Sequence, residues 1–290
     1  MSDSPRELLA LAEELAHEAG KLLMTYYPGG SGPSEAVGVS VRSKSTRTDL
    51  VTEADRASEQ LIVGRLDAAR AEDGILAEEG SARSGTSGLT WVIDPLDGTI
   101  NFVYGFPAFA VSIGCQRDDG ERVLGVVHDP VRDETFTALA GGGSARNSAP
   151  LHLPPSPPLS EALLATGFGY DSRRREAQAR LLPTVLPAVR DIRRAGAAAL
   201  DLCWMAAGRV DGCFESGLEP WDLAAGALVV EEAGGSIDIV DGIIPGAATV
   251  VASGPGLREP LLALLHEAVA AAGTYGATPP PEPPPRGSTR

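Results

Sequence analysis

Apolar residues recur at helical spacing in two segments near the start of the chain. The first segment spans residues 5–27, and its spacing is that of one face of an amphipathic helix. The apolar positions of this face are Leu8, Leu11, Ala12, Leu15, Ala19, Leu22 and Leu23. A second helix is predicted from Thr52, as N-cap, to about Ala71, with acids such as Asp55 in its first turn. Between them, the Gly-, Ser- and Pro-rich residues 28–48 predict a loop or a weak hairpin.

Apolar runs bounded by turn residues come next, and they predict strands. The predicted strands cover residues 74–77, 91–93, 108–116, 122–128 and 134–140. The last three are expected to form an antiparallel meander, with a turn at Asp118-Asp119-Gly120. The small residues of 80–88 predict a mobile surface loop between the first two strands.

The second half of the chain has a different pattern. Residues 149–160 contain five prolines and predict a connection between two halves. Strands and helices then alternate, as in an α/β fold. The predicted strands cover residues 162–166, 191–194, 210–215, 236–240 and 248–252, and the predicted helices cover residues 174–189, 197–208, 221–233 and 256–272. We therefore expect an N-terminal α+β half over residues 1–148, a C-terminal α/β half over residues 149–272, and a disordered Pro-rich tail over residues 273–290.

Composition narrows the class of protein. The chain has 290 residues and a formal net charge of −15, so binding of nucleic acid through a basic surface is not expected. No apolar run reaches the ~18 residues that a membrane helix needs, and the N-terminus lacks a signal-type segment. The three cysteines, Cys115, Cys203 and Cys213, have no metal-site spacing and are typical of buried thiols in a reducing compartment. These features predict a soluble, cytoplasmic protein with no membrane partner.

The stretch from Trp91 to Phe102 carries the most chemistry. It is an apolar run that ends on Asp94-Pro95-Leu96-Asp97-Gly98-Thr99, which places two carboxylates at the end of a predicted buried strand. Two close carboxylates repel each other unless a proton or a cation lies between them. Mg²⁺ prefers such oxygens, and Gly98-Thr99 can open a helix whose free N–H groups attract an anion. The pattern indicates phosphate-ester chemistry.

Two further acids stand at the ends of predicted elements. Glu78 ends the predicted strand 74–77, and Asp222 stands at the start of a predicted helix. Each acid alone is explained by a helix cap or a solvated turn. Considered with Asp94 and Asp97, they favour shared cations, because an unpaired carboxylate is costly at the end of a buried segment.

The residues around these acids resemble the inositol monophosphatase family. The matching segments are Asp49-Leu50-Val51-Thr52-Glu53-Ala54-Asp55, Ala77-Glu78-Glu79-Gly80, Asp94 to Phe102, and Glu219-Pro220-Trp221-Asp222 with the following residues to Gly235. The resemblance covers about residues 5–270. It implies a layered α/β/α/β/α fold with the site between the two halves. It also implies Mg²⁺-dependent hydrolysis of a phosphate monoester, in which a metal activates the attacking water.

The resemblance also implies roles for individual residues. The implied ligands of two or three Mg²⁺ ions are Glu78, Asp94, the backbone carbonyl of Leu96, Asp97 and Asp222. The implied catalytic residues are Thr99, Asp49 and Glu78: Thr99, with Asp49 in support, would orient the attacking water, and Glu78 would hold the metal that activates it. The implied substrate contacts are Asp97, Gly98, Thr99, Ala198, Glu215 and Asp222. By the same analogy, we expect a homodimer.

Several alternatives remain open at this stage. The leading substrate is myo-inositol 1-phosphate, and the rivals are fructose 1,6-bisphosphate, histidinol phosphate and 3′-phosphoadenosine 5′-phosphate. Ile100 stands where relatives acting on the last two often carry Lys, which favours the inositol branch. Arg173-Arg174-Arg175 is interpreted as a solvated helix start, whereas Arg193-Arg194 is left open between a surface and an anion-binding role. A non-catalytic regulatory protein on the same fold is the remote alternative.

Overall fold

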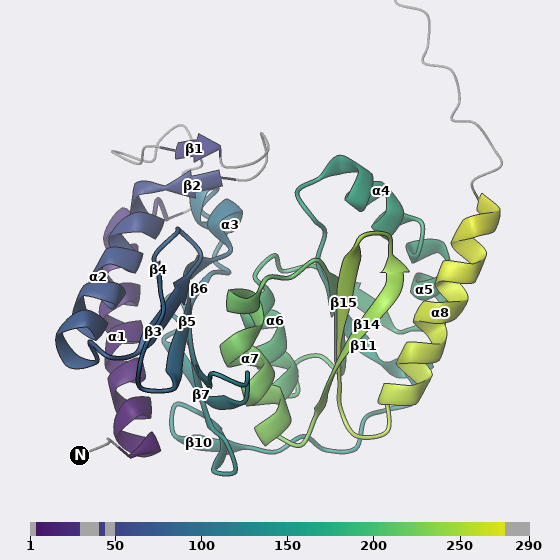
Figure 1. The fold of residues 1–290 in the computed structure, drawn as a ribbon. Coiled ribbons are helices and arrows are strands. Elements are labelled where there is room, and N and C mark those ends of the chain that lie inside the picture. The colour runs from purple at the N-terminus through teal and green to yellow at the C-terminus, as the bar shows by residue number, and fades with distance from the viewer. Residues whose placement is uncertain (1–3, 30–40, 44–49, 276–290) are drawn as a thin grey trace, which may run out of the picture.

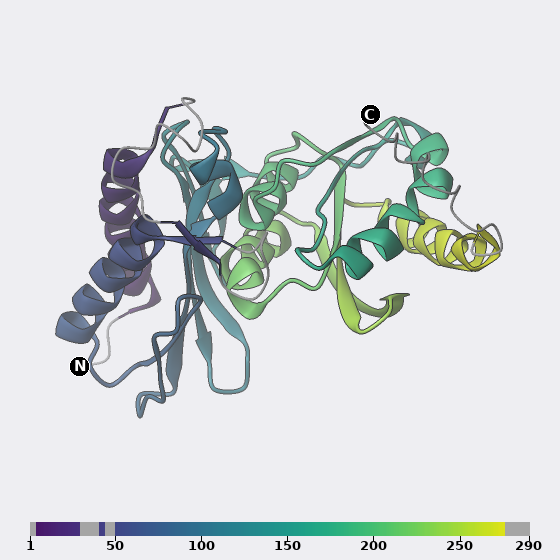
Figure 2. The same ribbon diagram turned by 90° about the horizontal axis from the view of Figure 1, so that it is seen from above.

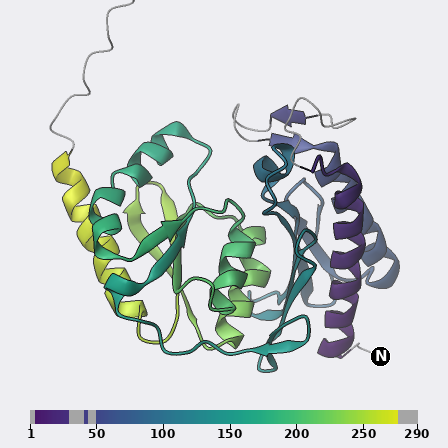
Figure 3. The ribbon, with the colours of Figure 1, turned by 180° about the vertical axis from the view of Figure 1, so that it is seen from behind.

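The elements of the chain stack in five layers (Figure 1). The computed structural model describes residues 4–29, 41–43 and 50–275. Helices α1 (Pro5–Tyr26) and α2 (Glu53–Ala69) cover the outer face of a first sheet. Helices α6 (Ala198–Ala206) and α7 (Pro220–Glu232) lie between the two sheets. The outer face of the second sheet is covered by α4 (Ser172–Ala179), α5 (Leu182–Ala188) and α8 (Arg258–Tyr275). Views from above and behind show the same order (Figures 2 and 3), which confirms the α/β/α/β/α layering.

The first sheet has eight strands in the order β10-β9-β8-β7-β6-β5-β3-β4. Its strands are β3 (Gly74–Ala77), β4 (Ala82–Arg83), β5 (Leu89–Asp97), β6 (Ala110–Arg117), β7 (Arg122–Asp129), β8 (Glu134–Leu139), β9 (Gly143–Arg146) and β10 (Ala149–Leu151). β3 and β5 are parallel, and the other neighbours are antiparallel. The predicted meander is confirmed as β6, β7 and β8. Strand β4 lies within residues 80–88, which were expected to form only a loop. Strands β9 and β10 were not predicted, and they extend the sheet at its other edge.

Strand β5 is longer than its apolar run. It was expected to end at Asp94, but it continues to Asp97, and its register with β6 shifts between these two residues. Pro95 has no N–H to give to the ladder, so an irregularity at this point is physically reasonable. Gly98 then takes φ 89° and begins α3 (Thr99–Val103), as the Gly-Thr pair predicts.

The second sheet has five strands in the order β12-β11-β13-β15-β14. Its strands are β11 (Leu163–Thr166), β12 (Asp191–Arg193), β13 (Gly212–Ser216), β14 (Ser236–Ile244) and β15 (Ala247–Ser253). A short 3-10 helix, Leu159–Glu161, precedes it. The helix predicted over 174–189 is in fact two helices, α4 and α5. Pro183 stands in the first turn of α5, where its missing N–H costs nothing, and a continuous helix would have required that N–H.

The predicted amphipathic face of α1 packs on the first sheet. Ser4 and Glu7 form a capping box at its start. Leu8, Leu15 and Leu23 are buried in one cluster with Trp91 of β5 and with Phe102 and Phe109. Leu11 and Leu22 are only partly buried, at the margin of this face. Burial of each large side chain contributes about 1.5–3 kcal/mol before the entropy cost of ordering it, so this cluster anchors the N-terminal helices.

Two glycines let α7 approach the first sheet closely. Gly114 and Gly125 are paired across β6 and β7. A Cβ atom at Gly114 would lie 2.6 Å from the Cβ of Ala224, and one at Gly125 would lie 2.8 Å from the Cα of Ala225. Because α7 also carries Asp222, this close packing sets how near that acid comes to the end of β5.

Some expectations fall largely outside the described residues. Strands β1 (Val41–Ser43) and β2 (Leu50–Thr52) pair antiparallel near the predicted loop, but Asp49 itself is not described. Of the predicted tail over 273–290, the residues to 275 belong to α8, so the helix runs further than expected. Over the described ranges, no helix is both long and apolar enough to span a bilayer.

Candidate active site

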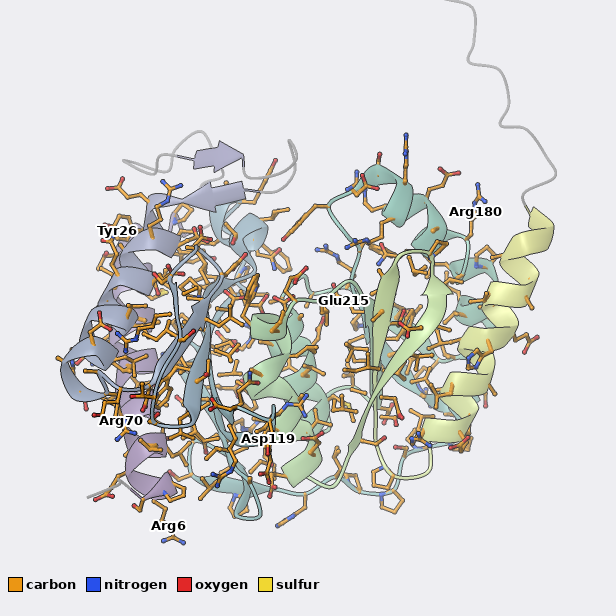
Figure 4. All side chains as sticks on the ribbon, viewed as in Figure 1. Arg6, Tyr26, Arg70, Asp119, Arg180 and Glu215 are labelled. Atoms are coloured by element: carbon orange, nitrogen blue, oxygen red, sulfur yellow. The ribbon has the colours of Figure 1, made fainter. Side chains whose placement is uncertain are left out.

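A cavity of about 400 Å³ lies between the two sheets. Its walls come from the ends of β3 and β5, from the start of α7, and from the segments that follow β11, β12 and β13. Figure 4 shows Glu215 in this central part of the molecule. The predicted site residues that line the cavity are Glu78, Asp94, Leu96, Asp97, Gly98, Thr99, Ala198, Glu215 and Asp222. The structure thus gathers into one place residues that are up to 144 positions apart, from 78 to 222.

Glu78, Asp94, Asp97 and Asp222 lie close together in the cavity, and the pKa values of the three Asp residues are raised. Burial raises the pKa of Asp94 well above its ordinary value, and the charges of the other three acids raise it further. Burial likewise raises the pKa of Asp97 to about 7 and that of Asp222 to about 8. Asp94 also shares a side-chain hydrogen bond with Glu78. Carboxylates in this state need protons or cations near neutral pH.

Backbone N–H groups orient three of these acids. Asp94 Oδ1 accepts from the N–H of Leu96 at 3.0 Å. The two oxygens of Asp97 accept from the N–H groups of Ala198 and Ala199 at 3.2 and 2.8 Å, which lowers its pKa against the effect of burial. The N–H of Ala198, expected to contact substrate, is therefore already used by Asp97.

Asp222 occupies a different helix position from the N-cap. Glu219 is the N-cap of α7, and Asp222 is the third residue of the helix. Asp222 Oδ2 accepts from the Glu219 N–H at 2.7 Å, which completes a capping box. Asp222 therefore stabilises the start of α7, as the sequence suggested for a capping residue, and it also belongs to the acidic cluster.

The donor set at this end of the cavity fits a hard divalent cation. It offers carboxylate oxygens and the Leu96 carbonyl, the oxygen ligands that Mg²⁺ prefers. As the side chains stand, no three His, Cys, Asp or Glu residues of the described part of the chain surround one common metal position. Binding would therefore require small rotations of the acidic side chains, which their cavity-facing positions permit.

Thr99 contacts an acid that the sequence did not single out for the site. Its Oγ1 lies 3.0 Å from Asp55 Oδ1 and 3.2 Å from the Leu96 carbonyl oxygen. The expected partner, Asp49, lies outside the described residues. Asp55 is fully buried, and it was interpreted only as a first-turn acid of α2. Its presence in the segment that resembles the family was the signal that pointed to it.

Comparison with known proteins decides the family. The sequence profile of the inositol monophosphatase family matches residues 4–271. The inositol-1-monophosphatase of Mycobacterium leprae is 43% identical over 277 residues, which cover 91% of this chain and 95% of that protein. The chain belongs to the inositol monophosphatase family. It is accordingly a phosphoric monoester hydrolase.

Other members of the family show how widely the similarity extends. The structure of Mycobacterium tuberculosis SuhB is similar at 40% identity, with a TM-score of 0.76, over 92% of this chain and 98% of that chain. The Nus factor SuhB of Vibrio cholerae is 45% identical over 188 residues, which cover 64% of this chain and 70% of that protein. The family fold is therefore shared by proteins that carry two different functional names.

Glu215 also lines the cavity in this family member, near enough to Asp97 and Asp222 for their charges to interact. It extends from β13, and its carboxylate lies directly against Gly167, where a Cβ atom would overlap it. Burial raises its pKa to about 7, the charge of Asp222 adds to the rise, and Arg194 opposes it. A glycine at 167 is thus a condition for the placement of this acid.

Two arginines also line the cavity, Arg174 and Arg194. For Arg174 this corrects the interpretation of residues 173–175 as a wholly solvated helix start. Arg173 fits that interpretation, because it is exposed and does not line the cavity. Arg175 instead donates to the carbonyls of Gly169 and Tyr170 at 3.0 and 2.7 Å.

Proposed function

We propose that this phosphatase is Mg²⁺-dependent and that it acts on myo-inositol 1-phosphate or a similar polyol monophosphate. The observation that carries the proposal is the acidic cluster beside the hydroxyl of Thr99, in which burial and neighbouring acids raise the pKa values of Asp94, Asp97 and Asp222. The name of the M. leprae relative supports the choice of substrate.

Glu78, Asp94 and the Leu96 carbonyl would hold a first Mg²⁺ ion. Asp97 and Asp222, with Asp94 shared, would hold a second, and Glu78 would contribute to a weaker third. Bound there, the ions would lower the pKa of water and offset the charge that develops on the phosphate and the leaving oxygen. Backbone bonds engage one oxygen of Asp94 and of Asp222 and both oxygens of Asp97, so the rotations needed for binding would be limited in range.

In this proposal, Thr99 orients the attacking water. A hydroxyl has one proton, so Thr99 donates either to Asp55 or to the Leu96 carbonyl at any one time. If the carbonyl is used as a metal ligand, the proton goes to Asp55, and the Thr99 oxygen is then free to accept a hydrogen bond from water. Asp55 thereby sets the direction of the hydroxyl. Asp49 remains a predicted second support.

The remaining substrate contacts follow from the shape of the cavity. Gly98 and Thr99 stand at the start of α3, where backbone N–H groups attract an anionic phosphate. Glu215, which also lines the cavity, would accept hydrogen bonds from polyol hydroxyls. The leaving group is thus held by the C-terminal part of the chain, and the phosphate by the N-terminal part.

Phosphate release with Mg²⁺ and with excess chelator tests the proposal. The panel contains inositol 1-phosphate, fructose 1,6-bisphosphate, histidinol phosphate and 3′-phosphoadenosine 5′-phosphate. We expect release only with Mg²⁺, and fastest from inositol 1-phosphate among the esters with one phosphate. Asp119→Asn, in an exposed turn, is the control for the loss of one acid. Release that is unchanged by chelation would refute the metal role, and a preference for histidinol phosphate would refute the polyol assignment.

A second candidate function comes from the relatives named Nus factor. Such a role would not depend on turnover, so an Asp94→Asn variant would lose phosphate release and keep the regulatory activity. Loss of both together would reject an independent regulatory role. The homodimer and the cytoplasmic location remain predictions, which sedimentation and fractionation would test.

A further inference from the structure

Arg174 and Arg194 are the cationic groups of the cavity wall. Arg174 is in the first turn of α4, and Arg194 follows β12, so two separate segments deliver them to one cavity. Within the described part of the chain, neither forms an ion pair with an acid. The charge of Arg194 does act at longer range on Glu215 and Asp201, and that of Arg174 acts on Asp171, which also lines the cavity. In a chain of net charge −15, two such guanidinium groups in the substrate cavity need an explanation.

Neighbouring arginines of the same region are used within the protein. Arg193 pairs with Asp191 at 2.6 Å, and Arg180 pairs with Glu176 at 2.6 Å. Arg175 donates to two backbone carbonyls, as described above. Protein groups therefore bind Arg175, Arg180 and Arg193, whereas Arg174 and Arg194, which line the cavity, remain available to a ligand.

Glycines make room for both cavity arginines. A Cβ atom at Gly169 would lie 2.7 Å from Arg174 Cδ, and one at Gly217 would overlap the Arg174 guanidinium. A Cβ atom at Gly196 would likewise overlap the guanidinium of Arg194. Arg174 thus reaches from the segment after β11 to the segment after β13. Any side chain at Gly169 or Gly217 would displace Arg174 from this position.

The segment that carries Arg194 is itself held in place. Asn101 Nδ2 donates to the carbonyls of Ala195 and Ala108 at 2.9 and 2.7 Å. Asn101 belongs to α3, which begins beside the proposed phosphate position. The distance between the phosphate end and Arg194 is therefore fixed by the fold and not left to a free loop.

We propose that Arg174 and Arg194 bind a second anionic group, a phosphate or a carboxylate, on the leaving-group side of the substrate. The inference rests on the proposed function, because the acidic end of the cavity must hold the reacting phosphate. A polyol without further charge would leave two guanidinium groups unmatched, whereas Arg binds phosphate and carboxylate through paired, charge-assisted hydrogen bonds. The cavity then still accepts inositol 1-phosphate, and an ester with a second, separated anionic group is hydrolysed with a higher kcat/KM.

Matched substrate pairs test this inference. Fructose 1,6-bisphosphate is compared with fructose 1-phosphate for a second phosphate, and 3-phosphoglycerate with glycerol 3-phosphate for a carboxylate. The quantity compared is the kcat/KM of the two-anion member of a pair divided by the kcat/KM of its one-anion member. In the wild type, we expect this ratio to exceed one in at least one pair. Arg174→Gln and Arg194→Gln should lower the ratio by roughly 10- to 100-fold, the value of a charge-assisted hydrogen bond. The ratio should change mainly through KM.

The control variants are Arg173→Gln and Arg193→Gln, which remove the same charge from exposed neighbours outside the cavity. They should leave the ratio within about twofold, because neither side chain lines the cavity that holds the substrate. Arg174→Lys should recover only part of the preference, since Lys keeps the charge without the paired donors. Equal ratios in cavity and control variants would overturn the inference.

Failure of the inference can be separated from failure of the proposed function. Mg²⁺-dependent release from inositol 1-phosphate, without any preference for the two-anion substrates, would keep the proposed function and reject the second anion site. As a readout apart from turnover, calorimetry would measure fructose 1,6-bisphosphate binding to Asp94→Asn. Binding weakened roughly tenfold or more by Arg174→Gln in that background supports the inference, and unchanged binding rejects it.

Discussion

The hydroxyl of Thr99 lies 3.0 Å from Oδ1 of Asp55, a residue 44 positions earlier in the chain. Asp55 is in the first turn of α2, and Thr99 begins α3. The contact joins the outer helical layer to the cavity, because Asp55 is buried and Thr99 lines the cavity wall. An acid that does not line the cavity therefore sets the direction of a hydroxyl that does.

Substitution of this pair should show coupling. Asp55→Asn keeps the size of the side chain but weakens its ability to accept the Thr99 proton, and we expect kcat to fall by about 10²-fold or more. Thr99→Val should cost at least as much. The double variant should be little worse than Thr99→Val alone, because both changes remove one interaction. Steady-state kinetics and thermal melts of the four proteins measure this.

Ser58→Ala is the matched control for the Asp55 experiment. Ser58 is buried in the same helix and donates to the Pro95 carbonyl at 2.9 Å, without contact to Thr99. Its loss should cost about 1–3 kcal/mol of stability and leave kcat within a few-fold. A fully additive double variant would show that Asp55 and Thr99 act separately.

Asp94→Asn should separate activity from stability. Because burial and three neighbouring acids raise the pKa of Asp94, its ionised form destabilises the metal-free fold. The variant should therefore melt at a higher temperature than wild type without Mg²⁺, while kcat falls by roughly 10²- to 10⁴-fold for the lost metal ligand. Phosphate release and calorimetry with and without chelator measure both effects.

Asp73→Asn is the control, because here the ionised acid stabilises the fold and its loss should lower the melting temperature. Hydrogen bonds from Arg70, at 2.8 Å, and from Trp91, at 2.8 Å, keep the pKa of Asp73 below its ordinary value although burial opposes them. This variant should melt at a lower temperature than wild type and keep its Mg²⁺ dependence.

The Asp94→Asn variant could also contradict the assignment of Asp94. Normal turnover, or a lower melting temperature than wild type in chelator, would do so.

The sequence predicted the acidic cluster because its residues sit at the ends of apolar runs. Periodicity located α1, the meander and most strands of the second sheet. The acids Glu78, Asp94 and Asp97 end buried segments, and that position is visible in the sequence as a change from apolar to charged residues. Helices, strands and strand-end acids could be predicted because each follows from residues that are neighbours in the sequence.

Prediction fell short where placement depends on contacts between distant segments. Nothing local distinguishes Arg174 from Arg173, yet only Arg174 crosses two glycines to reach the cavity. The pairing of Gly114 with Gly125 depends on strand register, and the helix that fills this space is about 100 residues further along. The partner of Thr99 likewise depends on how α2 packs on the first sheet.

The metal-free protein should lose stability as pH rises from about 4 to about 8. The pKa of Asp97 is raised to about 7 and that of Asp222 to about 8, so the folded state binds more protons than the unfolded chain over this interval. The free energy of unfolding therefore falls through it and levels off above it. Mg²⁺ requires the ionised acids, so its stabilising effect should grow with pH over the same range.

Thermal melts at a series of pH values, with Mg²⁺ and with chelator, measure this dependence. His128 acts in the opposite direction, because burial lowers its pKa to about 4, and its contribution to stability rises between about pH 4 and 6.5. Subtraction of an Asp222→Asn series removes that contribution. The difference curve should slope downward to about pH 8, and a flat curve would show that Asp222 titrates normally.

Gly125→Ala should disturb the site from a distance. The added Cβ would lie 2.7 Å from the carbonyl oxygen of Ala225 and 2.8 Å from its Cα, and backbone atoms cannot rotate away. Helix α7 must then shift from the sheet, and overpacking of this kind costs about 1–3 kcal/mol. Because Asp222 moves with α7, apparent Mg²⁺ affinity should fall together with the melting temperature.

Gly64→Ala is the matched control, since it makes the same chemical change in α2 where nothing lies within 4 Å of the new atom. Removing a glycine from a helix interior should stabilise the protein by about 0.5–1 kcal/mol. Its Mg²⁺ affinity and kcat should equal those of wild type. If Gly125→Ala lowered the melting temperature but kept the Mg²⁺ affinity of wild type, the position of α7 would not govern Asp222, and the acid would be held by its capping box alone.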